Sequence, residues 1–366
     1  MKKIYAILGA GNGGQAMAGY LSSRGCEVRL YDCSVETVEA INALGTITLS
    51  GVYSLSVCPF LVSTSMQEVV DGADIVMVVN PSMYHDSLAK ACAPYLKPGQ
   101  IIFLHPGGTF GAFAFRKALE VGGCVHAIPI AESNTLLFAC RSTKPGFVEV
   151  AGKKERILVA TLPADRNHLV MAAMGADLPE VEAADNVLVT SLDNTNPIVH
   201  PAPTLLNAST IEGGRTFLYY HEGISPSIGR LLEAMDGERV AIGMAMGLVP
   251  DKDLFTLTDQ YRIEYNTTGH DISDIMKKVS AYAGIKAPGT LRTRYLYEDI
   301  PMGLVPLVAL GKQLGISVRA MDLVVHLGEI MLGEDFSGTG RNTDNLGFGG
   351  MSALEIRNLA LTGGNC

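Results

Sequence analysis

The sequence predicts an α/β domain built around a parallel sheet, followed by an all-α domain. Up to residue 185, short apolar runs alternate with helical patterns, as expected for strand–helix–strand units. Beyond it, long helical patterns dominate and few strand signals remain. A chain of 366 residues also exceeds the size at which a single core usually keeps growing. We therefore expect two domains, residues 1–185 and 186–366.

A glycine-rich turn near the N-terminus predicts the function of the first domain. Residues 4–8 form an apolar run, residues 9–14 read G-x-G-x-x-G, and residues 15–23 have a helical pattern. In this context the first glycine allows a tight turn, the second lets the backbone approach a pyrophosphate, and the third lets the helix pack closely. The helix N-terminus would face the phosphates. We predict a Rossmann-type dinucleotide-binding domain whose cofactor contacts include Gly9, Gly11, Asn12, Gly13 and Gly14.

An acidic residue after the second predicted strand favours NAD as the cofactor. The strand over residues 27–31 ends in Asp32, at about the separation expected for an acid that accepts a hydrogen bond from the ribose 2′-hydroxyl. No arginine immediately follows Asp32, but Arg24 and Arg29 lie near enough in the sequence to keep NADP as an alternative. A plainer role for Asp32 is that of a strand-end turn residue or a helix cap.

Two further strand ends should line the nicotinamide half of the cofactor site. A buried strand over residues 74–80 ends in Asn80 and Pro81, and a strand over residues 100–104 ends in His105. Ligands of open parallel sheets bind outside the carboxyl ends of the strands. We therefore expect Asn80 and Pro81 to contact the cofactor, and we interpret His105 as a strand-end histidine rather than a catalytic one.

The remaining elements follow from hydrophobic periodicity and turn residues. A hairpin is predicted over residues 46–58. Strands that continue the sheet are predicted over residues 125–131, 147–151 and 157–161. Helices of the second domain are predicted over residues 225–246, 253–265, 273–283, 303–314 and 317–332. The residues placed to cap three of them are Ser225, Ser273 and Ser317.

Composition excludes several classes of protein. The formal net charge is −9 and no run of lysine and arginine occurs, so nucleic acid and anionic membranes are poor partners. No apolar segment reaches the roughly 18 residues of a membrane span, and the glycine-rich turn comes too early for a secretory signal. Seven cysteines without a C-x-x-C pair indicate a reduced, cytoplasmic protein. Motifs of zinc proteases, serine hydrolases and P-loop NTPases are absent, so we expect no metal.

A proline-rich segment at the start of the second domain holds a candidate catalytic histidine. Three prolines within residues 197–203 stiffen the backbone around His200. A histidine beside a nicotinamide can act as a general acid or base near neutral pH. The alternative is a histidine whose ring is satisfied by neighbouring backbone groups.

A second polar segment, residues 291–301, combines two arginines, two tyrosines and two acids. An arginine such as Arg294 suits a substrate carboxylate. A buried aspartate such as Asp299 would orient a catalytic histidine and favour its cation. The alternatives are a solvated surface charge for each arginine and, for Asp299, a cap of the helix that contains Pro301.

Several of these motifs together resemble the octopine/nopaline dehydrogenases, or opine dehydrogenases. The resemblance spans nearly the whole chain. It rests on the glycine turn and on Asn196-Pro-x-x-His200-Pro, Leu205-Leu-Asn207-Ala208, residues 294–299 and Gly303-Leu-Val-Pro306. It implies a dinucleotide-binding domain followed by an all-helical domain. It also implies an enzyme that uses NADH or NADPH to join a 2-oxo acid, such as pyruvate, to the amino group of an amino acid in a cleft between the domains.

The resemblance assigns roles by position. His200 would be the catalytic histidine, Asp299 the aspartate that pairs with it, and Arg294 an arginine beside them in the substrate cleft. Residues 132–141 are similar to a family segment that faces the substrate from the first domain. From these matches we expect substrate contacts at Thr135, Cys140 and Asn207.

A last segment departs from the family pattern, and two other functions stay open. Residues 340–347 resemble a family motif that usually reads Gly-Arg-Thr, but Asn342 follows Arg341. A ketopantoate-reductase-like enzyme or a 3-hydroxyacid dehydrogenase would share the fold and would use a lysine, such as Lys312 or one of residues 277–278. A dinucleotide-binding regulatory module without turnover would share the glycine turn. We also expect a homodimer.

Overall fold

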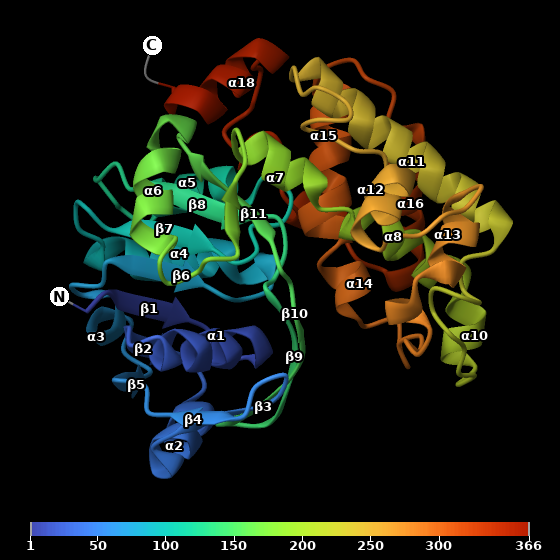
Figure 1. The fold of residues 1–366 in the computed structure, drawn as a ribbon. Helices are drawn as coiled ribbons and strands as arrows, with labels where there is room; N and C mark the ends of the chain where they lie inside the picture. The colour runs from blue at the N-terminus through green and yellow to red at the C-terminus, as the bar shows by residue number, and fades with distance from the viewer. Residues whose placement is uncertain (1, 365–366) are drawn as a thin grey trace. The chain divides into compact units, whose positions relative to one another are not determined.

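The computed structural model describes residues 2–364. The chain folds into two compact units (Figure 1). The first comprises the chain up to Ser191 together with the segment from Asn358 onward, and the second comprises Leu192–Arg357. We predicted a boundary after residue 185, whereas this division falls after Ser191 and also groups the C-terminal segment with the first unit.

An eight-stranded sheet forms the centre of the first unit, in the order β12-β11-β8-β7-β6-β1-β2-β5. Every neighbouring pair is parallel except β8 and β11. The strands are β1 (Ile4–Leu8), β2 (Glu27–Tyr31), β5 (Leu61–Ser63), β6 (Ile75–Val78), β7 (Ile101–Leu104), β8 (Ile130–Ser133), β11 (Ile157–Leu162) and β12 (Val181–Ala183). β6 and β7 are buried along their whole length, as expected when helices cover both faces of a parallel sheet. The predicted Rossmann-type fold is confirmed.

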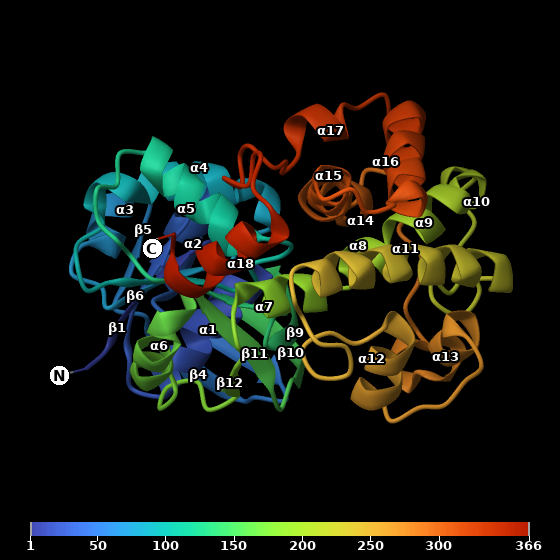
Figure 2. The same ribbon diagram turned by 90° about the horizontal axis from the view of Figure 1, so that it is seen from above.

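Helices connect these strands. They are α1 (Asn12–Ser23), α2 (Val35–Leu44), α3 (Met66–Val70), α4 (His85–Cys92), α5 (Gly111–Val121) and α6 (Asn167–Met174), and α7 (Val187–Asp193) follows the last strand. Short 3-10 turns are η1 (Ser82–Tyr84), η2 (Ala93–Tyr95) and η3 (Ala164–Arg166). α4 and α5 pack against each other, as the view from above shows (Figure 2).

A second, four-stranded sheet has the order β4-β3-β10-β9. Its strands are β3 (Ile47–Gly51), β4 (Leu55–Val57), β9 (Phe138–Lys144) and β10 (Phe147–Lys153). Helix α1 lies between this sheet and strands β1 and β2 (Figure 1). The fit is close, because a Cβ added at Gly19 of α1 would lie 2.8 Å from Leu49 of β3.

The second sheet confirms one strand prediction and corrects another. The predicted hairpin over residues 46–58 is formed by β3 and β4. The strand predicted over residues 147–151 does not continue the main sheet, because β10 pairs antiparallel with β9 and parallel with β3. Its side chains alternate between buried and more exposed, which suits a sheet covered on one face. The strand predicted over residues 125–131 begins only at Ile130, and Val125 is 87% exposed.

The second unit is helical, as predicted. Its helices are α8 (Asn196–Val199), α9 (Pro201–Leu206), α10 (Ala208–Glu212), α11 (Pro226–Ala245), α12 (Leu257–Glu264), α13 (Ile272–Lys278), α14 (Arg294–Tyr297), α15 (Val305–Gln313), α16 (Arg319–Leu332) and α17 (Phe336–Thr339). A 3-10 turn, η4 (Ser280–Tyr282), and a π-helical turn, η5 (Ile300–Leu304), complete it, and α18 (Ala353–Thr362) leads back to the first unit. None of the helices within residues 2–364 is long and apolar enough to cross a bilayer.

Of the three predicted serine caps, one is confirmed and two are wrong. The Ser225 hydroxyl accepts a hydrogen bond from the Ile228 N–H at the start of α11. α13 is capped instead by Asp271, while the buried Ser273 hydroxyl donates to the Ile224 carbonyl. α16 begins after Val318, which is its N-cap, so Ser317 is not the cap. The carboxylate of Glu238 accepts from the N–H groups of Ala320 and Met321 in its first turn. Glu238, which is distant in the sequence, thus accepts the hydrogen bonds that a local capping side chain usually accepts at a helix start.

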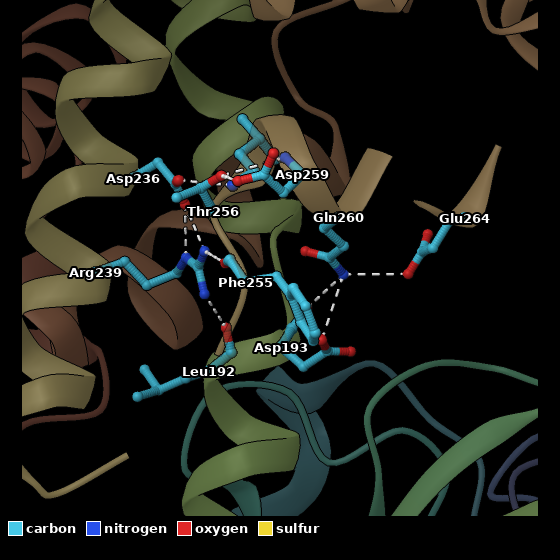
Figure 3. A network of polar contacts seen from close by, with 10 residues as sticks. Leu192, Asp193, Asp236, Arg239, Phe255, Thr256, Asp259, Gln260 and Glu264 are labelled. Atoms are coloured by element: carbon cyan, nitrogen blue, oxygen red, sulfur yellow. Dashed lines mark hydrogen bonds and ion pairs between the residues drawn. The ribbon is translucent and has the colours of Figure 1, made fainter. Parts of the chain in front are cut away.

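A buried ion pair holds the first residues of the second unit to α11. Arg239 is 1% exposed, and its guanidinium donates to Asp236, to the Leu192 carbonyl and to the Phe255 carbonyl at 2.8, 2.6 and 2.6 Å (Figure 3). The second carboxylate oxygen of Asp236 accepts from the Leu257 N–H at 2.7 Å. Because each charge has several partners, the cost of burying the pair is offset.

His105, at the end of β7, is a structural residue, as we interpreted it. It is 1% exposed, and its Nε2 accepts from the Leu137 N–H at 3.1 Å. Its Nδ1 therefore carries the proton and donates to the Ser133 hydroxyl at 2.8 Å. Burial lowers the pKa of His105 to about 3, so the ring is neutral at physiological pH.

We expect acid to destabilise the fold through His105. In the unfolded chain a histidine has a pKa of about 6.5, whereas the folded value is about 3. Between these values the unfolded state binds more protons, so the free energy of unfolding falls as the pH drops, by up to about 1.4 kcal/mol per pH unit. His105→Gln, whose side-chain oxygen can still accept a hydrogen bond, should flatten this slope in urea unfolding experiments. Replacing the exposed His126 by Gln is the control, and equal slopes in both variants would contradict the expectation.

Candidate active site

The glycine turn after β1 has the geometry of a dinucleotide site. Gly9 has a φ of +108°, which favours glycine, and a Cβ at Gly14 would lie 1.7 Å from the Gly9 carbonyl oxygen. The fold itself thus requires these two glycines. A Cβ at Gly11 would meet nothing within 4 Å, and at Gly13 it would lie 3.0 Å from Val79. Open space beside Gly11 fits a position reserved for a ligand, since packing within the protein does not require glycine there.

The N-terminus of α1 is suited to an anion. Gly11 is its N-cap, no side chain caps it, and its first turn carries no acid. Its amide groups therefore keep the positive end of the helix dipole unopposed. The side-chain oxygen of Asn12 accepts from the Ser142 N–H at 2.9 Å, which ties β9 to this turn.

Asp32 lies beside the same turn. Its carboxylate accepts hydrogen bonds from the Ala10 N–H at 2.7 Å and from the Ser34 N–H at 2.9 Å. The cap of α2 is Ser34, so Asp32 is not a helix cap; its bond to the Ser34 N–H does make it a turn residue. Arg24 and Arg29, for which we kept NADP as an alternative cofactor, do not bind Asp32. Arg24 donates to the Ala176 carbonyl, and Arg29 binds Glu27 and the Asp71 carbonyl.

Pairing of β1 with β6 brings Asn80 to the glycine turn. Its side-chain amide donates to the Leu8 carbonyl at 2.7 Å, and it fills the space where a Cβ of Gly9 would stand. Pro81 follows and is the N-cap of η1. The cofactor residues predicted from separate strand ends therefore lie together at one edge of the sheet.

The second unit brings His200 and Asp299 together. Nδ1 of His200 lies 2.7 Å from a carboxylate oxygen of Asp299, although 99 positions separate the two residues in the sequence. Both side chains are nearly buried, at 11% and 14% exposed. Burial raises the pKa of Asp299, and the adjacent His200 partly offsets this effect. Asp299 stands at the N-cap of η5, but its side chain makes no capping bond, so it binds the histidine instead.

Aromatic residues hold the ring of His200. Tyr295 of α14 stacks on it, with centroids 4.0 Å apart and planes 13° from parallel. Nε2 lies 3.0 Å from the Tyr220 hydroxyl. The hydroxyls of Tyr219 and Thr204 donate to the His200 carbonyl at 2.6 and 2.7 Å. The alternative in which backbone groups satisfy the ring does not hold, because both ring nitrogens have side-chain partners.

Arg294 lies near this pair but does not contact it. The side chain is 66% exposed, and its Nε donates to Glu298 at 2.6 Å. The terminal nitrogens of Arg294 make no hydrogen bond with the described residues, so an anionic ligand would meet them first.

The three tentative substrate residues are engaged by the protein itself. The Thr135 hydroxyl accepts from Lys154 at 3.2 Å. Cys140 of β9 packs against the core of the first unit, and burial raises the pKa of its thiol to about 11. The Asn207 amide donates to the Pro203 and Gly223 carbonyls at 2.8 and 3.0 Å. These bonds support local structure.

The segment around Arg341 packs against η5. Arg341 is 4% exposed, and its backbone N–H donates to the Pro301 carbonyl of η5 at 2.9 Å. Asn342, which departs from the family pattern, accepts from the N–H groups of Asp344 and Asn345. The asparagine thus shapes a turn.

Sequence reasoning missed the tyrosines around His200. Tyr295 belongs to a segment that we had singled out, but its stacking has no signal in the sequence. Tyr219 and Tyr220 precede His221 in the sequence, and we did not single them out. Their contacts with His200 depend on how distant segments pack. Within residues 2–364 no group of acids, histidines and cysteines could hold a metal ion.

Two family models match the sequence. The alpha-helical domain of the NAD/NADP octopine/nopaline dehydrogenases matches residues 183–332, and the N-terminus of NAD-dependent glycerol-3-phosphate dehydrogenase matches residues 4–108. The chain is 38% identical to an opine dehydrogenase of Arthrobacter sp. (strain 1C) over 356 residues, which cover 97% of this chain and 98% of the relative.

Solved structures agree on the fold. A structure of octopine dehydrogenase with NADH and L-arginine superposes with a TM-score of 0.83 at 23% identity, covering 100% of this chain and 99% of the other. A ketopantoate reductase from Ralstonia eutropha JMP134 has a TM-score of 0.62 at 22% identity, covering 90% and 98%.

Proposed function

The chain belongs to the octopine/nopaline (opine) dehydrogenase family, and we propose that it uses NADH to join a 2-oxo acid reductively to the amino group of an amino acid. The observation that carries this proposal is the hydrogen bond between His200 and Asp299, which places a paired acid–base group in the helical unit. The cofactor would be held by the glycine turn, Asp32, Asn80 and Pro81 of the first unit.

The reaction needs a group that moves protons. The neutral amine adds to the carbonyl carbon, the carbonyl oxygen takes a proton and becomes a hydroxyl, and the nitrogen, which has become cationic, loses a proton. That hydroxyl takes another proton and leaves as water, so that an iminium ion forms. The iminium carbon then takes a hydride, which a bound NADH would supply, and the products would be a secondary amine, NAD⁺ and water. The net reaction consumes one proton, and positioned acid–base catalysis typically contributes about 10²–10⁴-fold in rate.

In this proposal His200 is the acid–base residue and Asp299 holds it in place. The Nδ1–H of His200 donates to the carboxylate, which fixes the tautomer and the orientation of the ring. Arg294 would bind a substrate carboxylate through its terminal nitrogens. We keep Thr135, Cys140 and Asn207 as proposed contacts of the substrate, although their side chains serve local structure.

The two rival functions find less support. A reductase that relies on lysine would need an ammonium group at the reacting oxygen. Lys312 and Lys278 are paired with Asp322 and Asp274 at 2.8 Å, and Lys277 is an exposed residue of α13. A regulatory module without turnover would not need a buried histidine–aspartate pair. The fold alone does not decide, because the ketopantoate reductase shares it.

We further propose a homodimer in a reducing compartment, such as the cytoplasm. The cysteines within residues 2–364 are unpaired, which fits a reducing environment. On α16, Leu323 and Ile330 are 61% and 80% exposed, and a second copy of the chain would cover such an apolar strip.

The proposed function predicts that turnover depends on two substrates. NADH oxidation should be followed with pyruvate and a panel of amino acids, leaving out each component in turn. We expect oxidation only when both the oxo acid and an amino acid are present. Oxidation with the oxo acid alone would favour the simpler reductase, and binding of NADH without turnover would favour the regulatory module.

The position of Asp32 predicts that NADH binds more tightly than NADPH. Its carboxylate would accept from the ribose 2′-hydroxyl and repel a 2′-phosphate. Calorimetry should show this preference in the native protein and a reduced preference in Asp32→Ser. Arg24→Gln is the control and should change neither affinity, because Arg24 is bound to the Ala176 carbonyl. Equal affinities of the native protein for both cofactors would contradict the prediction.

His200 and Asp299 should behave as one unit in kinetics. His200→Ala should lower kcat by about 10²–10⁴-fold with little change in NADH binding, and Asp299→Asn should lower it as well. The double variant should lose much less than the product of the two single losses, because the second change removes help already lost.

The exposed His326 supplies a control, since His326→Ala should leave kcat unchanged. Thermal melts on the same samples separate a catalytic loss from unfolding. Multiplicative losses in the double variant would indicate separate roles, and a fully active His200→Ala enzyme would refute the mechanism.

A further inference from the structure

Both ring nitrogens of His200 already have partners within the protein. Nδ1 is bound to Asp299 at 2.7 Å, and Nε2 lies 3.0 Å from the Tyr220 hydroxyl. The ring faces are also occupied on one side, where Tyr295 stacks at 4.0 Å. A proton that leaves or reaches Nε2 in this arrangement therefore passes the hydroxyl of Tyr220.

Tyr220 is fixed in this position by its own packing. It is 5% exposed, and its ring stacks on Tyr282 with centroids 4.1 Å apart and planes 19° from parallel. Tyr219 packs edge-on against it at 5.0 Å. Moving the hydroxyl away from Nε2 would break both contacts, so the bond to His200 is part of the packed structure.

The hydroxyl of Tyr220 has the chemistry of a relay. It carries one hydrogen and two lone pairs, so it can accept a proton on one side and give its own on the other. Burial raises the pKa of Tyr220 well above its usual value, and the nearby hydroxyls of Tyr295, Tyr282 and Tyr219 add to this rise, that of Tyr295 also through a hydrogen bond with Tyr220. The group therefore stays a neutral hydroxyl.

We propose that Tyr220 is a catalytic residue that passes the proton between Nε2 of His200 and the reacting oxygen of the substrate. This inference rests on the proposed function. As the C–N bond forms and the carbonyl π electrons move to oxygen, that oxygen takes the hydrogen of Tyr220, and Tyr220 takes the hydrogen on Nε2. One proton moves from imidazolium to substrate, and Tyr220 begins and ends as a hydroxyl. His200 then regains the proton that the cationic substrate nitrogen loses, and the same route in the same direction protonates the hydroxyl that leaves as water.

The neighbouring tyrosines are placed for other tasks, and one of them gives a control. The Tyr219 hydroxyl donates to the His200 carbonyl and not to the ring. The Tyr265 hydroxyl lies 2.9 Å from the hydroxyl of Tyr282 and belongs to the same aromatic cluster, but it does not contact His200. Tyr265→Phe removes a hydroxyl of the same kind from the same cluster and should leave turnover unchanged.

The test is Tyr220→Phe, which keeps the stacked ring and removes only the hydroxyl. With both substrates present, we expect kcat to fall by about 10²-fold or more, while NADH affinity and the melting temperature stay close to those of Tyr265→Phe. The double variant His200→Ala, Tyr220→Phe should be no slower than His200→Ala alone, because the two groups act in series. The isotope effect of NADH deuterated at the transferred position should approach one in Tyr220→Phe, since imine formation then limits the rate.

Three results would overturn the inference. Unchanged or faster turnover of Tyr220→Phe would show that the hydroxyl merely occupies Nε2 until substrate displaces it. Losses that multiply in the double variant would show that the hydroxyl acts independently of His200. An isotope effect that stays as large as in the native enzyme would show that imine formation does not limit the rate of Tyr220→Phe. A native protein that does not oxidise NADH with both substrates would overturn the proposed function itself, and the native control separates that failure from failure of the relay.

Discussion

The hydrogen bond between His200 and Asp299 is the interaction on which the chemistry of the helical unit depends. It joins the turn between α8 and α9 to the start of η5, and it sets which nitrogen of the ring carries the proton. Close packing makes it possible. A Cβ at Gly303 of η5 would lie 2.2 Å from Pro197 of α8, so only glycine lets these two segments approach. The close packing of η5 against the proline-rich segment thus brings Asp299 to His200.

In the first unit, the geometry of the parallel sheet brings the proposed cofactor-binding residues close together. β1, β2, β6 and β7 run in one direction, so the residues that follow them meet at one edge. Asp32 and Asn80 approach the glycine turn for this reason. The smaller sheet adds a further contact through Asn12 and Ser142, which the strand ends alone do not provide.

Buried polar residues that have no role in the proposed reaction stabilise the fold of each unit. Glu132 is fully buried, and its carboxylate accepts from the Ala112 N–H at the start of α5 and from the Thr190 and Ser191 hydroxyls. Arg239 and Asp236 form a comparable network in the second unit. Each of these groups would be costly to bury alone, and each becomes tolerable because neighbouring backbone and side chains complete its hydrogen bonds.

The sequence by itself determined the features that depend on neighbours along the chain. The glycine turn, the acid after β2, the buried strands and the long helices all have local patterns, because turns, strands and helices obey short periods. The resemblance also pointed to His200 and Asp299. Their approach to 2.7 Å, the Tyr220 hydroxyl at Nε2 and the Glu238 carboxylate at the start of α16 were decided only by tertiary structure. Such contacts join segments tens of residues apart, and no local pattern records which distant side chain will fill a given space.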